Sequence, residues 1–189
     1  MLATNHERRR FTIDEVARMV DAGVLGEDEP LELIEGELIV VPPQGPEHAE
    51  RVTRLTMLLA PRYVGRADVR VQCPLDLDAI NQPEPDLAVV HPTPGRHPRG
   101  ADVLVVIEIS KSSQALDRTK VGLYARGGVP IYWRIDLVAR RVEEHTHPTA
   151  AGEYGVTRVY GARDTIALPE LGSAELGETV PVEALLGPE

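Results

Sequence analysis

The sequence contains a single cysteine, Cys73, among its 189 residues. One cysteine excludes an internal disulfide framework and a cysteine-rich zinc site. Its neighbours Gln72 and Pro74 do not suggest a nucleophile, so we interpret Cys73 as a small core residue. A chain of this length can bury a proper hydrophobic core without such cross-links.

Long apolar segments are also missing. No apolar run approaches the roughly 20 residues that are needed to cross a bilayer. Residues 1–10 are polar and lack the apolar segment of a secretory signal. We therefore expect no membrane partner and a cytoplasmic location. The length predicts a single domain over residues 11–189, preceded by a flexible tail of residues 1–10.

Positive charge is in deficit, because the formal net charge is −10. A protein that holds DNA by its backbone needs Lys and Arg to displace counterions from the phosphates. The largest basic cluster is formed by the arginines at positions 8–10, and such a group near a terminus is more typical of a solvated tail than of a nucleic-acid arm. Composition therefore argues mildly against tight, non-specific binding to DNA.

Hydrophobic periodicity and breaker residues predict alternating helices and strands. Helices are expected at about residues 12–22, 46–61, 116–126 and 181–186. Strands are expected at about residues 31–35, 37–41, 69–72, 74–78, 85–90, 103–110, 130–136, 140–146, 154–160 and 165–168. Thr12 and Glu15 have the spacing of a capping box. This order predicts a mixed sheet flanked by helices, an α/β or α+β fold.

Two of the predicted strands each carry one carboxylate, Asp86 and Glu108, among strand-forming aliphatic residues. A carboxylate on a buried strand is costly unless it is paired. A divalent cation is the simplest shared partner, because Mg²⁺ takes one or two carboxylates and keeps water for the rest. An ion held by Asp86, Glu108 and the carbonyl of Ile109 would leave positions for water and a phosphate oxygen, as metal-assisted hydrolysis requires.

A structural interpretation of the same carboxylates stays open at this point. They could pair with arginines such as Arg118 or Arg134, or lie at exposed strand ends. The alternation of a strand places Glu108 and Ser110 on one face and the neighbouring isoleucines on the other.

A combination of motifs resembles the Uma-type family of restriction endonucleases, which is similar in fold to the PD-(D/E)XK nuclease superfamily. The motifs are Leu31-Glu32-Leu33-Ile34-Glu35-Gly36-Glu37-Leu38, His48, Pro85-Asp86, Glu108-Ile109-Ser110, Asp117, Lys120, Leu123-Tyr124-Ala125-Arg126-Gly127-Gly128-Val129-Pro130 and Tyr132-Trp133-Arg134-Ile135-Asp136. The resemblance implies a restriction-endonuclease-like core, with a central mixed sheet between helices. It also implies Mg²⁺, for which Mn²⁺ can substitute, and DNA as the substrate.

The resemblance further implies that Asp86 and Glu108 are metal ligands. The superfamily lysine would fall at position 110, where this chain has Ser110. Lys120 on the following helix is the expected replacement, since an ammonium near the scissile phosphate stabilises developing negative charge. The alternative for Lys120 is an exposed helix lysine paired with Asp117.

Glu32 and His48 also match family positions, and we expect them to complete an acidic, proton-handling pocket. The apolar and aromatic residues of the 123–133 segment, Tyr124 among them, are assigned to packing of a helix on the sheet. A homodimer is expected, because cutting both strands of a duplex requires two active sites. The alternative function is a nuclease-like scaffold without catalysis that serves as a binding or assembly module, which the negative charge and Ser110 favour.

Overall fold

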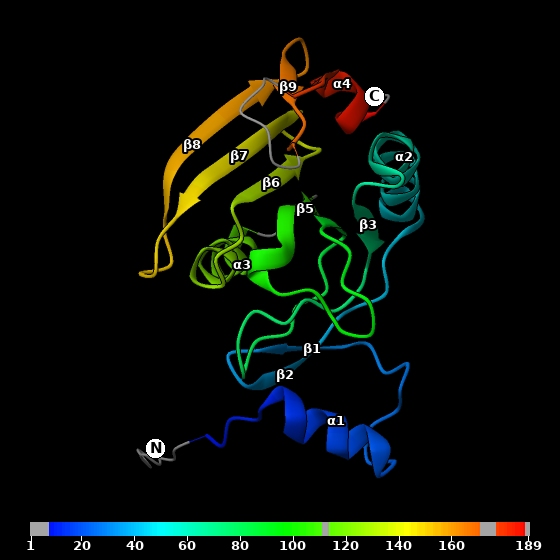
Figure 1. The fold of residues 1–189 in the computed structure, drawn as a ribbon, viewed down its shortest axis with the longest axis vertical. Helices are drawn as coiled ribbons and strands as arrows, with labels where there is room; N and C mark the ends of the chain where they lie inside the picture. Colours follow the sequence, from blue (N-terminus) through cyan, green and yellow to red (C-terminus); the bar gives the residue numbers. More distant parts are fainter. Residues whose placement is uncertain (1–7, 111–113, 171–176, 188–189) are drawn as a thin grey trace.

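A six-stranded mixed sheet forms the centre of the protein (Figure 1). The computed structural model describes residues 8–110, 114–170 and 177–187. The strand order is β3-β4-β5-β6-β7-β8. The strands are β3 (Asp68–Val71), β4 (Leu87–Val90), β5 (Val103–Ser110), β6 (Ile131–Asp136), β7 (Arg141–Pro148) and β8 (Tyr154–Gly161). Neighbours pair antiparallel, except that β5 and β6 are parallel and are joined through helix α3 (Gln114–Arg126).

Helices cover both faces of this sheet. On one face, α2 (Pro46–Tyr63) and the short α4 (Val182–Leu186) pack on a large apolar cluster that includes Ile107 and Trp133. On the other face, α3 packs through Tyr124 on a smaller cluster that includes Val106 and Tyr132. The alternation of β5 therefore sends Ile107 towards α2 and Glu108 towards α3.

Helix α1 (Ile13–Asp21) and the antiparallel hairpin of β1 (Leu31–Ile34) and β2 (Glu37–Val40) lie at the end of the molecule opposite β9 (Figure 1). The Gln82 amide donates to the Leu33 carbonyl at 2.7 Å and ties β1 to the loop before β4. A second small hairpin pairs β9 (Thr165–Ala167) with β10 (Thr179–Pro181), and a 3₁₀ turn at Gly100–Asp102 precedes β5. The β1–β2 hairpin therefore lies beside the loop that leads into β4.

The predicted fold class is confirmed, and several local predictions agree with the structure. The capping box is present: the Glu15 amide donates to Thr12 Oγ1 at 3.2 Å, and the Thr12 amide donates to Glu15 Oε2 at 3.1 Å. The β1–β2 hairpin turns at Gly36, as expected. Helix α3 ends at Arg126, and the turn that follows contains Gly128, whose left-handed φ of 77° suits glycine.

One prediction is wrong. The predicted strand at 74–78 is an irregular segment with only isolated β-bridges at Asp76 and Asp78, whose side chains accept hydrogen bonds from Gln82 and Asn81. Its alternating acids therefore reflect side-chain bonds of a turn rather than a place in the central sheet. The helix predicted at about residues 46–61 agrees with α2, which runs from Pro46 to Tyr63. The buried Tyr63 hydroxyl donates to the Pro169 carbonyl at 2.8 Å.

Within the described residues, no helix is long and apolar enough to cross a membrane. The division into a tail of residues 1–10 and one domain of residues 11–189 stays a prediction.

Candidate active site

Asp86 lies immediately before β4 and is buried, with 5% of its surface exposed. Its Oδ2 accepts a hydrogen bond from the Ile109 amide at 2.8 Å. His48 Nε2 lies 2.7 Å from Asp86 Oδ1, and the Gln44 amide donates to the same oxygen at 3.3 Å. Asp86 therefore joins the end of β5 to the first turn of α2.

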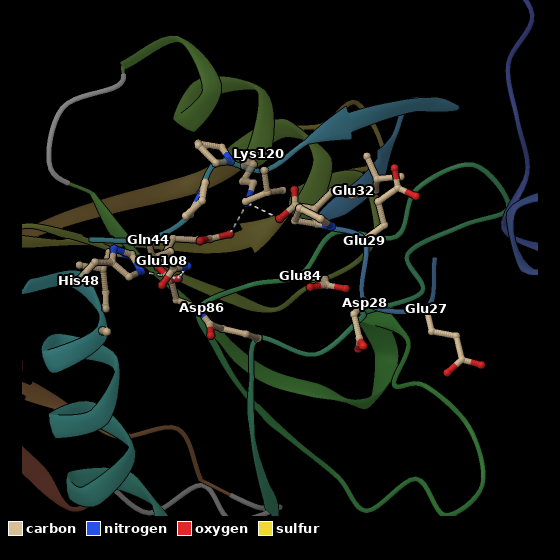
Figure 2. A pocket seen from close by; sticks show the side chains of 18 residues that line it. Glu27, Asp28, Glu29, Glu32, Gln44, His48, Glu84, Asp86, Glu108 and Lys120 are labelled. Carbon is tan, nitrogen blue, oxygen red and sulfur yellow. Dashed lines mark hydrogen bonds and ion pairs between the residues drawn. The ribbon is translucent and has the colours of Figure 1, made fainter. Parts of the chain in front are cut away.

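Glu108 occupies the face of β5 that is covered by α3. Its Oε1 accepts from Tyr124 Oη at 2.7 Å and from Lys120 Nζ at 3.1 Å. Lys120 also donates to Glu32 Oε1 at 3.2 Å, so this ammonium bridges a carboxylate of β5 and a carboxylate of β1 (Figure 2). Lys120 and Tyr124 are four residues apart, which places both side chains on one face of the helix.

Burial dominates the electrostatics of this group. It raises the pKa of Glu108 to about 7, an effect that Lys120 opposes and Asp86 reinforces. Burial alone would lower the pKa of Lys120, but the carboxylates of Glu108 and Glu32 outweigh it, so the pKa lies above its usual value. Burial and the neighbouring Glu108 raise the pKa of Tyr124 well above 10, so its hydroxyl is a proton donor at neutral pH.

The three carboxylates and Lys120 line one open cleft of about 830 Å³, whereas Tyr124 lies behind its wall. Its inner carboxylates all accept hydrogen bonds and are Glu32 and Asp86, which are buried, and Glu108, which is largely buried. Its outer wall consists of four further acids, Glu27, Asp28, Glu29 and Glu84. Figure 2 shows His48 and Asp86 at one end of the cleft and Glu27 and Asp28 at the other. The cleft therefore favours cations over a bare phosphate.

The structure brings all of the predicted site residues to this cleft. The lining includes Asp86, Glu108, Lys120, Glu32, His48 and Ile109. Their roles in catalysis stay predictions. Ser110, at the expected lysine position, is buried, and its carbonyl accepts from the Leu137 amide at 3.1 Å.

The structural alternatives are resolved in part. Arg134 donates to Glu143 at 2.8 Å and to Asp136 at 3.4 Å, and both of these acids lie outside the cleft. Lys120 pairs with two of the inner carboxylates, Glu32 and Glu108. The side chains of Asp117 and Arg118 lie outside the described part of the chain.

Two polar contacts were not anticipated from the sequence. Tyr124 was assigned to packing, yet its hydroxyl contacts Glu108. Gln44 was not singled out, although it donates to Asp86. The spacing of four residues between Lys120 and Tyr124 was the available signal for Tyr124. Gln44 lies in the segment before α2 and carries no comparable signal.

The donor set suits Mg²⁺ or Mn²⁺. Hard cations take oxygen ligands, and Mg²⁺ uses few carboxylates and keeps several waters. In residues 8–110, 114–170 and 177–187, no group of three or more His, Cys, Asp or Glu side chains could hold a metal. The two carboxylates Asp86 and Glu108 therefore fit a partly hydrated ion rather than an all-protein cage. The Ile109 amide faces Asp86, and in an extended strand the carbonyl of the same residue faces the same way.

The mixed sheet between helices defines a nuclease-like α/β fold. The chain is similar to a solved structure described as a "putative nuclease belonging to DUF820 from Anabaena variabilis", with 20% sequence identity and a TM-score of 0.62 over 93% of this chain and 97% of the other. At this identity the likeness shows the fold alone. A comparison with curated proteins finds no match. The family model of Uma2, described as "Putative restriction endonuclease", matches residues 13–181, and the chain belongs to this family.

Proposed function

We propose that this protein is a metal-dependent endonuclease that hydrolyses phosphodiester bonds of DNA. The observation that carries the proposal is the convergence of Asp86 and Glu108. Asp86 is hydrogen-bonded to the main chain at Ile109, the residue after Glu108, and Lys120 contacts Glu108 in an open cleft. Membership of the Uma2 family supports the same class of reaction.

Each residue has a role in this proposal. Asp86, Glu108 and the carbonyl of Ile109 hold Mg²⁺ or Mn²⁺. Such an ion, when bound, polarises a phosphoryl group and lowers the pKa of a coordinated water. Lys120 supplies positive charge to the developing phosphorane.

Two further residues support these groups. Glu32 holds the Lys120 ammonium at 3.2 Å, and His48 lies 2.7 Å from Asp86, where its ring can accept or return a proton. We also propose a homodimer, because cutting both strands of a duplex requires two sites related by a two-fold axis.

A catalytically inactive binding or assembly scaffold is the second candidate. The acidity of the cleft favours it, because seven carboxylates line the cavity and repel a phosphate backbone. The pairing of Lys120 with two of these carboxylates favours it further, since much of that positive charge is already neutralised.

Cleavage of supercoiled plasmid in Mg²⁺ and Mn²⁺ tests the endonuclease. Asp86→Ala and Glu108→Ala are each expected to lower the cleavage rate by roughly 100-fold or more, since each removes a ligand that stabilises charge in the transition state. Glu50→Ala is the matched control, because Glu50 is an exposed acid paired with Arg54 outside the cleft. Equal activity in the parent and both site variants would contradict the proposal.

Calorimetric titration with Mn²⁺ separates the two candidates. The endonuclease predicts binding heat in the parent and in Glu50→Ala that disappears in Asp86→Ala. A scaffold without a metal site predicts no such heat in any of these proteins.

A further inference from the structure

We infer that Tyr124 is a positioning residue that fixes the orientation of the Glu108 carboxylate, in addition to packing α3 on the sheet. The inference deepens the proposed function and rests on it where Glu108 acts as a metal ligand. Tyr124 is fully buried, and its hydroxyl donates to Glu108 Oε1 at 2.7 Å. This hydrogen bond is shorter than the one that Lys120 donates to the same oxygen, at 3.1 Å.

The position of this hydroxyl is set by packing rather than by the carboxylate. The Tyr124 ring lies among buried apolar residues of the α3 face of the sheet, and its centroid is 5.3 Å from that of Tyr132. A closely packed aromatic ring has little rotamer freedom. The other donor, Lys120, reaches Glu108 through a flexible four-carbon stem and also binds Glu32. Tyr124 is therefore the rigid member of the pair.

The two donors act on the same oxygen. Among the described residues, both Lys120 and Tyr124 donate to Oε1 of Glu108. An ion bound through Oε2 would not compete with either donor. Within residues 8–110, 114–170 and 177–187, the Tyr124 hydroxyl thus commits one oxygen of Glu108 to the helix and leaves the other for a ligand. Outer-shell hydrogen bonds of this kind orient metal-binding carboxylates.

Tyr154 provides a matched control for the loss of one buried hydroxyl. It belongs to the same aromatic group, with its ring 6.4 Å from that of Tyr132. Its hydroxyl donates to the Val129 carbonyl at 2.9 Å, and Tyr154 does not line the cleft. Tyr124→Phe and Tyr154→Phe each remove one hydroxyl from the same side of the sheet, but only the first alters a carboxylate of the site.

The test measures Mn²⁺ binding by calorimetry for the parent, Tyr124→Phe and Tyr154→Phe, with thermal melting of all three as the check on folding. Tyr124→Phe is expected to raise the Kd for Mn²⁺ by about 10-fold or more, as is typical for loss of an outer-shell hydrogen bond. Tyr154→Phe is expected to leave this Kd within about 2-fold of the parent, because it touches no ligand. If the parent cleaves DNA, Tyr124→Phe should lower kcat and leave KM for DNA unchanged.

Crystal structures without metal provide a second readout that does not depend on the proposed function. In Tyr124→Phe the Glu108 carboxylate is expected to rotate away from its parent orientation, and in Tyr154→Phe it is expected to keep it. An unchanged Mn²⁺ affinity in Tyr124→Phe overturns the inference. Should the parent bind no Mn²⁺, the proposed function fails and the crystal structures decide: an unmoved carboxylate overturns the inference, and a rotated one supports it.

Discussion

The inner carboxylates and the outer wall of the cleft are the same kinds of residue in opposite environments. The inner side chains are 6%, 7% and 13% exposed, and each accepts hydrogen bonds from named donors. The outer wall is exposed to solvent, and among the described residues its acids make no ion pairs. The contribution of a buried charge to the free energy of unfolding depends strongly on its partner, whereas a solvated charge contributes little. The inner carboxylates should therefore respond far more strongly than the outer wall to the loss of a single partner.

The largest effect should come from removing the partner of the inner carboxylates. Lys120→Met leaves Glu32 and Glu108 buried without their cation, which typically costs about 3–5 kcal/mol in the free energy of unfolding. The matched control is Arg126→Met, which breaks a half-exposed ion pair with Glu35 and should cost less than about 1 kcal/mol. Urea denaturation of both variants measures the difference.

The double variant Lys120→Met with Glu32→Gln sharpens this result. It removes one of the two stranded charges and should recover part of the lost stability. Similar costs for Lys120→Met and Arg126→Met would remove the distinction between a buried bridge and a surface pair.

The next effect is a pH dependence that is specific to Glu108. Its folded pKa of about 7 lies above the ordinary value of 4.5, because burial disfavours the charged form. The folded state then binds the proton more tightly, so the contribution to stability is full below about pH 4.5 and is lost as pH rises to about 7. A pKa difference of this size corresponds to roughly 3 kcal/mol at most.

Urea denaturation of the parent and Glu108→Gln between pH 4.5 and 8 measures this dependence. The stability of the parent relative to Glu108→Gln should fall as pH rises and level off above pH 7. Glu27→Gln in the outer wall serves as the control and should follow the parent across the range. A pH-independent difference between the parent and Glu108→Gln would show that Glu108 is not perturbed by its burial.

The sequence was sufficient to place Asp86 and Glu108 on neighbouring strands. It was not sufficient to show which side chains donate hydrogen bonds to them. Asp86 and Glu108 stand out because charges interrupt aliphatic strands, and β4 and β5 are indeed neighbours. The facing of Glu32 could not be read, because Leu33 and Ile34 break the alternation before the turn at Gly36. Its burial depends on Lys120, which is 88 positions away in the chain. Such long-range pairing has no local signal.

Local patterns also failed where two physical causes produce one pattern. The alternating acids at Asp76 and Asp78 matched a strand, but they bind the side chains of a turn. Tyr124 fitted the apolar face of a helix, and it does pack there. A tyrosine carries both an apolar ring and a polar hydroxyl. Helix periodicity predicts that the ring is packed, but it does not predict the partner of the hydroxyl. The hydrogen bond to Glu108 is therefore seen only in the structure.

The smallest effect on stability should come from the outer wall. Neutralising Glu27, Asp28 and Glu29 together, as Glu27→Gln, Asp28→Asn and Glu29→Gln, should change the free energy of unfolding by less than about 0.5 kcal/mol per substitution, because these side chains are exposed. The same triple variant should bind DNA more tightly by roughly 5-fold at low salt, from a few tenths of a kcal/mol per removed like charge. The gain should shrink at high ionic strength, since solvated charges are screened.

Fluorescence anisotropy with a labelled duplex at two salt concentrations measures this change in affinity. The control is a triple variant of exposed acids away from the cleft, Glu50→Gln, Glu153→Gln and Glu183→Gln, which removes the same net charge. If only the outer-wall variant gains affinity, the wall opposes the approach of phosphates to the inner carboxylates. If both variants gain equally, the repulsion arises from the net charge of −10 and not from the cleft. Unchanged affinity in both would indicate that duplex DNA does not enter the cleft, and would favour the scaffold over the endonuclease.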